Sequence, residues 1–366
     1  IAPGDVIGIG ADAYRIDRLA HADTIQIEAV RVEAGSYAPV DIKDELPVSA
    51  AMVPAMPVFS QFLDLPIFRG DQVPHAPYLA VRSDPWQGHV AVFSSVSSSG
   101  FNLLQRVNMP SVIGRTTVQL QQGRAGLWDR GAALRVFLPG GQLESRGAID
   151  VLNGENWAAI GDGSVENWEV FQFQSATLIG PDLYEVRVLL RGQAGTDAID
   201  QTTWPVGSIF VLLDSRPNQL NIGAGLLGQE QNFLIGPARK PYSDQSYSQT
   251  AVAFSGAGLR PLSPVHLRST TSGSGDVRLS WVRRTRTGGD SWAGLDVPLG
   301  EEQEQYLVQI MQAGTVIRHA LVDAALFTYS SAMQNADGVS GDLDFLVAQI
   351  SASYGAGLFG KGTFNV

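Results

Sequence analysis

Apolar and polar residues alternate along many short stretches of the chain, and Gly, Pro and Asn residues separate these stretches. Alternation with a period of two is typical of strands that bury one face. Near the beginning, Ile25, Ile27 and Ala29 fall on one face of such a stretch, and Gln26 and Glu28 fall on the other. The pattern predicts strands at residues 6–9, 13–19, 24–33, 78–82, 89–95, 133–138, 168–178, 183–190 and 208–213.

The alternation is most regular in the last part of the chain. The apolar positions of two predicted strands there are Val277, Leu279, Trp281, Tyr306, Val308 and Ile310. Two more strands are predicted at 327–329 and 345–350. Several short strands within about 100 residues, with a Trp on an early strand, are typical of an immunoglobulin-like sandwich. Because the chain has no Cys, we expect the fibronectin type III form, in which Trp281 fills the core without a disulfide.

The rest of the chain is also predicted to be mainly β. Segment 220–234 comes nearest to a helix, but its three glycines would each cost about 1 kcal/mol in a helix interior. Residues 39–60 carry four prolines and few aromatic residues, a composition typical of a semi-extended linker. We therefore expect several β modules in series: strands at 1–38, a Pro-rich linker at 39–60, a mainly-β domain at 61–262 and a fibronectin type III-like domain at 263–366.

Composition and charge narrow the possible functions. With 44% hydrophobic residues in a chain of 366, there is ample material for buried cores, which excludes a disordered chain. A net charge of −11 argues against a general nucleic-acid binder, because it repels phosphate backbones. No apolar run approaches the ~18 residues of a membrane span. The chain lacks Cys, and its five His are widely spaced, so we expect no metal site, no cofactor, no nucleic-acid partner and no membrane insertion.

Two glycine-rich stretches imitate nucleotide-binding motifs. In segment 355–363, Gly362 stands where a P-loop needs Ser or Thr after Lys361. Segment 223–228 fits G-x-G-x-x-G but lacks the surrounding βαβ unit and a suitably placed acidic residue. We interpret the first stretch as a turn and a last strand, and the second as a chance match in a Gly-rich chain.

Acidic residues suggest two further kinds of site. Segments 162–166 and 337–344 imitate calcium loops, but one lacks the required Gly and the other has the wrong spacing. Carboxylates beside aromatic rings can bind sugars, and a pair of carboxylates could hydrolyse a glycosidic bond. The candidate sugar-contact residues are Glu155, Trp157, Glu166 and Trp168. The alternative is that these Trp residues fill a core while the acids lie in solvated turns.

One string carries a family resemblance. Leu189-Leu-Arg-Gly-Gln-Ala-Gly-Thr-Asp197 resembles Leu-Arg-Gly-x-x-Gly-Thr strings of tail-tip hub, or host-specificity, proteins of siphophage-like particles. Its two glycines predict a tight reversal with positive φ at the end of a strand. Other segments resemble the C-terminal part of the large baseplate protein of alphaproteobacterial gene transfer agents: Phe62-Leu-Asp-Leu-Pro66, Val73-Pro-His-Ala-Pro77, Val151-Leu-Asn-Gly154, Gly258-Leu-Arg-Pro-Leu-Ser-Pro-Val-His266, Trp281-Val-Arg-Arg-Thr-Arg-Thr-Gly-Gly-Asp-Ser-Trp292 and Val297-Pro-Leu-Gly300.

The resemblance implies a structural protein of a phage-like tail tip or baseplate, located in a virion-like particle and involved in assembly and host-surface recognition. Residues 1–38 would be closing strands of a tail-hub domain. The family's glycosidase-like barrel lies further upstream and is not part of this sequence, so no catalytic residue is carried over.

The expected partners are other tail proteins, copies of the chain itself, and a bacterial surface receptor or polysaccharide. Candidate contact residues are Arg191, Arg283, Arg284 and Trp292. The alternative function is a module that binds or cleaves carbohydrate of the capsule or cell wall.

Overall fold

The computed structural model of the chain describes residues 1–33, 35, 56–199, 203–289 and 296–366. These residues fall into two compact units, Ile1–Pro54 and Ala55–Val366. Most of the predicted linker at 39–60 lies outside the described residues, and a strand already begins at Phe59, inside its last part. No helix in the described part of the chain has the length and apolar character needed to cross a membrane.

The first unit is a three-stranded antiparallel sheet. Its strands are, in order, β1 (Val6–Ile9), β2 (Asp12–His21) and β3 (Ile25–Arg31). The register pairs Ile27 with Leu19 and Ala29 with Ile16, so the predicted apolar positions of β3 share a face with apolar residues of β2. Ile16 is buried, whereas Ile25 and Ile27 are exposed. Within its described residues, the unit therefore leaves much of its apolar face uncovered.

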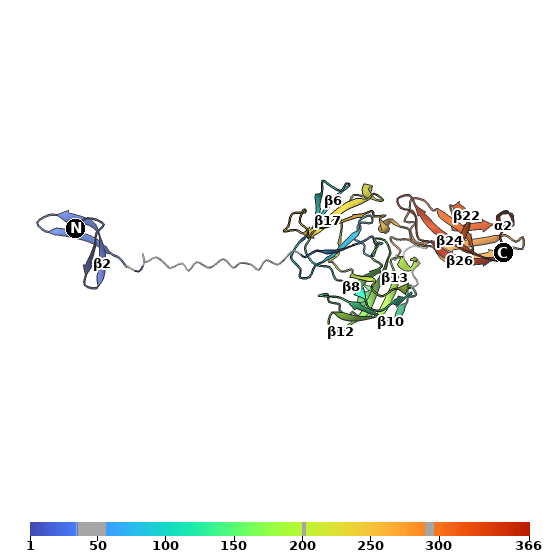
Figure 1. Ribbon diagram of the computed structural model, residues 1–366, viewed down its shortest axis with the longest axis horizontal. Helices are drawn as coiled ribbons and strands as arrows, with labels where there is room; N and C mark the ends of the chain where they lie inside the picture. Colours follow the sequence, from blue (N-terminus) through green and yellow to red (C-terminus); the bar gives the residue numbers. More distant parts are fainter. Residues whose placement is uncertain (34, 36–55, 200–202, 290–295) are drawn as a thin grey trace. The chain divides into compact units, whose positions relative to one another are not determined.

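The second unit contains a closed antiparallel barrel (Figure 1). Around the barrel the strands are β10 (Trp128–Phe137), β13 (Leu183–Gln193), β12 (Trp168–Gly180), β11 (Trp157–Gly161), β15 (Ile209–Leu212) and β8 (Ile113–Thr116). β8 pairs with β10 and closes the ring. The connections contain α1 (Ala148–Leu152), the 3-10 turn η2 (Thr196–Ala198) and the paired strands β9 (Leu120–Gln121) and β14 (Thr203–Trp204).

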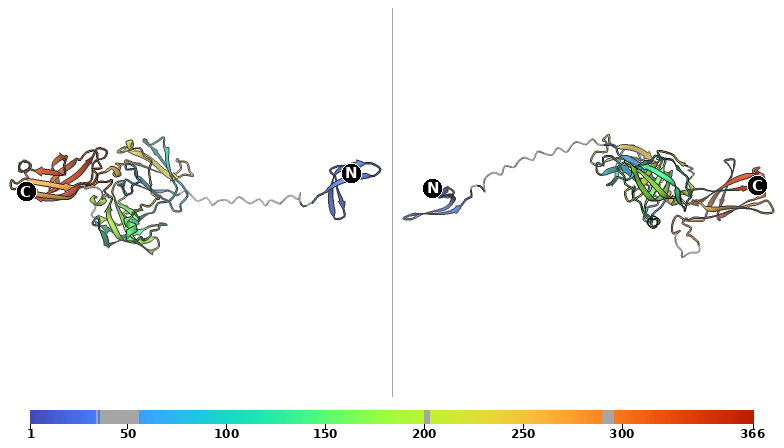
Figure 2. Two further views of the ribbon diagram at one scale, coloured as in Figure 1. Left: turned by 180° about the vertical axis from the view of Figure 1, so that it is seen from behind. Right: turned by 90° about the horizontal axis from the view of Figure 1, so that it is seen from below.

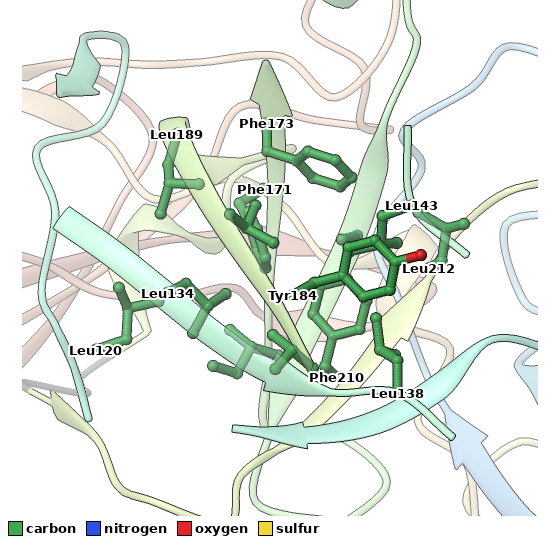
Figure 3. Packing of buried hydrophobic residues seen from close by; sticks show 14 of the residues in the cluster. Leu120, Leu134, Leu138, Leu143, Phe171, Phe173, Tyr184, Leu189, Phe210 and Leu212 are labelled. Atoms are coloured by element: carbon green, nitrogen blue, oxygen red, sulfur yellow. The ribbon is translucent and has the colours of Figure 1, made fainter. Parts of the chain in front are cut away.

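Large apolar side chains fill the barrel interior. Phe171 and Phe173 from β12, Leu189 from β13 and Phe210 from β15 converge there (Figure 3), and all four are fully buried. The rings of Phe171 and Phe210 meet edge to face with their centroids 6.2 Å apart, a favourable aromatic arrangement. The interior is therefore a packed core, which leaves the outer surface and the ends of the barrel for binding.

A second β body is built from the segments before and after the barrel. One of its sheets consists of β16 (Asn218–Gln219), β5 (Tyr78–Arg82) and β4 (Phe59–Leu63). The other consists of β18 (Ser248–Val252), β17 (Gln231–Pro237), β6 (Val90–Ser95) and β7 (Asn102–Val107). The short turns η3 (Ala224–Leu226) and η4 (Ala257–Leu259) lie in its second segment.

The core of this second body joins the two segments. The rings of Phe62, Phe233 and Phe254 lie 5.0 to 5.9 Å apart, although Phe62 is far from the other two in sequence. The chain leaves the body after β7, forms the barrel, and returns at β16. The barrel is thus an insertion, and the segment predicted as one mainly-β domain, 61–262, contains two bodies.

Strands β11 and β15 are buried on both faces. Ala158 and Phe210 belong to the barrel interior, whereas Ala159 and Val211 pack outside the barrel in a cluster that includes Leu63 of β4. This double burial explains why residues 209–213 form a continuous apolar run instead of alternating.

The last module is a two-sheet sandwich. One sheet has the order β19 (Val265–Thr271), β20 (Val277–Val282), β23 (Leu326–Tyr329). The other contains β22 (Thr315–Val322), β21 (Tyr306–Gln312), β24 (Asp342–Ser351), β26 (Gly360–Asn365) and the short β25 (Gly355–Ala356). The helix α2 (Ser331–Asp337) connects β23 to β24. Two further views show these orange and red strands gathered in one module (Figure 2).

This strand order confirms the predicted fibronectin type III-like sandwich, and the whole chain is mainly β as expected. Trp281 is 4% exposed, and its ring meets that of Tyr306 edge to face at 5.3 Å. Segment 355–363, which imitates a P-loop, forms β25 and most of β26 as predicted. Segment 220–234 contains η3 and the start of β17 in place of a helix.

Replacing Trp281 by Ala should destabilise the last module by about 3–5 kcal/mol, because it removes a large buried ring and leaves a cavity. Chemical denaturation of the full chain measures this loss. Its neighbour Val282 is 52% exposed on the same strand, so Val282→Ala should leave the transition almost unchanged. Equal transitions for the two variants would contradict the sandwich core described here.

Candidate functional site

The main candidate site is an open groove of about 540 Å³ beside the first residue of β11. Three segments distant in sequence line it: residue 69, residues 142–157 and residues 212–216. Trp157 is its aromatic residue and is half-buried, and its ring packs against Phe68 with centroids 5.4 Å apart. Gln142, Glu155 and Ser215 contribute exposed polar side chains. The groove therefore combines one aromatic surface with a mostly polar and charged lining.

Internal hydrogen bonds hold one wall of the groove. The Nδ2 amide of Asn156 donates to the carbonyls of Glu144, at 2.9 Å, and Phe173, at 3.1 Å, and so ties segment 142–146 to the barrel. The buried Gln172 donates to the carbonyl of Glu155 at 2.9 Å and also to that of Val151. These bonds fix the loop between α1 and β11, so the groove is preformed.

The three arginines of the groove are bonded within the protein. Arg146 lies 2.7 Å from a carboxylate oxygen of Glu144 and 3.8 Å from one of Glu155. Arg216 forms an ion pair with Asp214. Arg69 donates to the carbonyls of Leu213 and Asp214. The three arginines thus already have acceptors in the folded chain.

The structure separates the four candidate sugar-contact residues. Glu155 and Trp157 line the groove together. Trp168 is 1% exposed, packs in the cluster outside the barrel, and donates its Nε1–H to the carbonyl of Ser164 at 2.8 Å. Glu166 is exposed in the turn before β12. Only the first pair shares a concave surface.

Arg191, expected as a surface contact, is 1% exposed, so this expectation is corrected. Its Nε and Nη2 donate to the two carboxylate oxygens of Glu169, both at 2.6 Å. Its Nη1 donates to the carbonyl of Gln121 at 2.8 Å. Trp204 Nε1 and the backbone N–H of Gly192 complete the shell of Glu169 at 2.7 and 3.1 Å. Arg191 is therefore buried in an ion-pair network and cannot face a partner.

The rest of the string 189–197 forms a tight reversal, as its glycines predict. Gly192 and Gly195 have φ of +58° and +84°, and a Cβ on Gly195 would lie 2.2 Å from the side chain of Leu262. The string ends at Asp197, whose carboxylate lies 3.1 Å from Arg284 of the last module. It therefore joins the barrel to the segment that leads into the sandwich.

Two of the other candidate contact residues are bonded within the chain, and the third lies outside the described residues. Arg284 also donates to the carbonyl of Ser263 at 2.7 Å, and Arg283 pairs with Asp296 at 2.6 Å. Both arginines thus make bonds within the chain, and their side chains are only 25% and 17% exposed. Trp292 lies outside the described residues.

Among the described residues, the structure brings together no group of three His, Asp or Glu side chains that could hold a metal ion. In the first acidic segment, Asp162 accepts hydrogen bonds from Ser164 N and Asn167 Nδ2, at 2.8 and 2.7 Å. In the second, Asp337 accepts from the Arg318 guanidinium at 2.7 and 2.8 Å and from the Tyr329 hydroxyl at 2.7 Å. Both carboxylates stabilise their own local structure.

Comparison with known proteins finds one family model that matches part of the chain. Residues 111–211 match the family model described as Rcc01698-like, C-terminal. Rcc01698 is a Rhodobacter protein associated with the gene transfer agent. The matched segment coincides with the barrel, whose first strand begins at Ile113 and whose last ends at Leu212. No curated protein matches the chain significantly.

Solved structures also resemble the chain in part. Domains d3–d4 of the rat CD45 extracellular region are 10% identical, with 42% of this chain and 72% of that chain covered and a TM-score of 0.23. The FN1–FN3 domains of chicken CNTN1 are 9% identical, with 86% and 99% covered and a TM-score of 0.22. At these TM-scores the likeness carries no argument, and the fold assignment rests on the strand order.

Sequence reasoning missed most of the groove. It selected Glu155 and Trp157, which lie two residues apart, but not Arg69, Gln142 or Arg216. No local signal marks these three, because their neighbourhood arises only when β11 pairs with β15 and the barrel packs on β4 and β5.

Replacing Arg191 by Met should destabilise the barrel by about 3–5 kcal/mol, because it leaves the buried Glu169 without a counter-ion. Denaturant unfolding of the full chain measures this loss. Arg187→Ala is the control, since Arg187 is 48% exposed and pairs with Glu185, and exposed pairs contribute less than about 1 kcal/mol. The double variant Glu169→Gln, Arg191→Met should recover part of the loss. A loss of stability from Arg191→Met no larger than that from Arg187→Ala would contradict the stabilising role of the Glu169–Arg191 ion pair.

The stability of the last module should depend on Asp337. The Arg318 guanidinium, aided by the Tyr329 hydroxyl, lowers the pKa of Asp337 below its ordinary value of 3.8. A lowered folded-state pKa stabilises the fold above pH 3.8, and this stabilisation is lost as the pH falls through the folded pKa. Asp337→Asn should therefore be less stable than wild type at pH 7.

The difference in stability between wild type and Asp337→Asn should narrow as the pH falls below 3.8. Thermal unfolding between pH 2 and 7 checks the prediction, with Asp323→Asn, at an exposed carboxylate, as control. A pH-independent difference between wild type and Asp337→Asn would exclude ionisation of Asp337 as the cause.

Proposed function

We propose that this chain is a structural and adhesive part of a phage-like tail tip or baseplate, of the kind that gene transfer agents carry. The observation that supports this most is that the family match at 111–211 covers one complete folding unit, the closed barrel. A match to a whole folding unit, with its core and closing strands, supports common structure better than a match to a fragment does. The resemblance of strings outside the barrel points to the same kind of particle.

The arrangement of the chain suits assembly. The β bodies, one of which contains the barrel as an insertion, present loops and strand edges to neighbouring proteins. The first unit leaves the apolar side chains of Ile25 and Ile27 uncovered within its described residues, a feature that favours packing against a neighbour. The proposed partners are other tail proteins, further copies of this chain, and a receptor or polysaccharide of the bacterial surface. The proposed location is the tail tip of a virion-like particle.

We propose no catalytic role. A glycosidase of the common type needs one carboxyl group that is protonated near neutral pH in a sheltered site. The two carboxylates in the groove that lie near each other in the fold, Glu144 and Glu155, are both exposed and both lie near the Arg146 cation. Glu166 lies outside the groove. This environment favours binding over hydrolysis.

The location can be tested on particles purified from a bacterium that produces the protein. The chain should co-sediment with the particles, and gold-labelled antibody against the last module should mark the tail end opposite the head. Arg191→Met should reduce the amount of chain in particles, because a destabilised barrel does not assemble, while Arg187→Ala should be incorporated normally.

One result would overturn the proposal. In that result, a strain that lacks the chain releases complete particles that attach normally to the host. In the wild-type strain, the chain is then found only in fractions that contain no particles.

A further inference from the structure

The groove offers an aromatic surface that is held in place and remains accessible. Trp157 packs on Phe68, which fixes its ring, yet it lines the groove and is only half-buried. Its Nε1–H makes no hydrogen bond with any described residue. A Trp ring with one packed side and a free N–H combines an apolar face with a polar donor. Pyranose rings have the matching pattern, with C–H faces and equatorial hydroxyl groups.

The lining of the groove supplies uncommitted polar groups. Gln142 and Ser215 are exposed, and their side chains make no hydrogen bond with any described residue. Among the described residues, the Glu155 carboxylate has only the long contact of 3.8 Å with Arg146. Amide and hydroxyl groups can bind sugar hydroxyls as donor or acceptor, and a carboxylate can bind them as acceptor. Polar groups placed beside an aromatic ring can fix the orientation of a small ligand.

The charge balance points to a neutral ligand. The groove contains three arginines and three acidic residues, and each arginine already has an acceptor inside the protein. An anionic ligand would have to compete with Glu144 for Arg146 and with Asp214 for Arg216. A ligand that carries hydroxyl groups and no charge needs no such exchange. The volume of about 540 Å³ lies within the usual range for small-ligand sites, about 300–1,000 Å³.

We propose that this groove binds a short segment of a neutral glycan, with one pyranose ring stacked on Trp157 and its hydroxyl groups bonded to Gln142, Glu155 and Ser215. The loop bonds of Asn156 and Gln172 hold these groups in place before the ligand arrives, which lowers the entropy lost on binding. The groove binds the glycan without cleaving it. This site does not depend on the proposed function, because the purified full chain can be tested by itself.

The test uses the purified full chain and an array of defined oligosaccharides. Neutral probes are cello-, chito-, manno- and malto-oligosaccharides, and acidic probes are alginate and hyaluronan oligosaccharides. Wild-type protein should bind at least one neutral series, and titration calorimetry gives the affinity. Trp157→Ala should weaken that binding by at least about tenfold, because the stacking surface is lost. Gln142→Ala should weaken it by about two- to fivefold, the effect of one hydrogen bond.

Tyr242→Ala provides the matched control. Tyr242 is also a half-exposed aromatic residue packed on a Phe ring, at 5.5 Å from Phe93, but it lies outside the groove. The Tyr242→Ala variant should bind the neutral oligosaccharide with the affinity of the wild type. Should Trp157→Ala fail to fold, Gln142→Ala and Trp157→Phe decide the question, because the Gln142 side chain is exposed and the Phe ring retains the packing on Phe68.

Four outcomes would overturn the proposal. They are no binding of any neutral probe, binding of acidic probes alone that high salt abolishes, equal effects of Trp157→Ala and Tyr242→Ala, and shortening of the bound probe during incubation. None of these outcomes bears on whether the chain is found in tail particles, so the two proposals can fail separately.

Discussion

The buried ion pair between Glu169 and Arg191 is the interaction on which the barrel and its connections depend. Its hydrogen bonds join β12, β13, β9 and β14, because Trp204 and the carbonyl of Gln121 belong to the same network. Desolvating two charges is tolerable only when nearly all their hydrogen bonds are satisfied, and here both carboxylate oxygens and all three guanidinium nitrogens have partners. The network therefore requires one arrangement of the strands and connections around it.

The same stretch of chain also links the barrel to the last module. After Arg191 the chain reverses through Gly192 and Gly195, and the absence of a side chain at Gly195 lets Leu262 approach closely. Two residues later, Asp197 pairs with Arg284, which also bonds the carbonyl of Ser263. The string with the family resemblance therefore has a structural explanation: one short segment completes the barrel and forms the joint to the sandwich.

Because the barrel interior is packed, binding has to use surfaces outside it. The groove at Trp157 is formed where the loop after α1 and the segment after β15 come together beside the barrel wall. Its aromatic residue, Trp157, packs on Phe68, and Gln142 and Ser215 contribute exposed polar side chains to its lining. A rigid β scaffold with a site formed by its connections is a common way for all-β proteins to bind ligands. This arrangement can serve a recognition role without any catalytic machinery.

The sequence alone determined the strands whose side chains alternate, and with them the class of the last module. Val277, Leu279 and Trp281 are buried as their spacing predicts, because period-two alternation directly reflects one buried and one exposed face. The sequence also indicated Glu155 and Trp157 as candidate sugar-contact residues, because they lie close together along the chain. Tertiary structure decided the rest: that 61–262 contains an inserted barrel, that Arg191 is buried, and that Arg69 and Gln142 meet Trp157. These facts depend on contacts between residues far apart in sequence, and local patterns of polarity carry no information about which distant strand will become a neighbour.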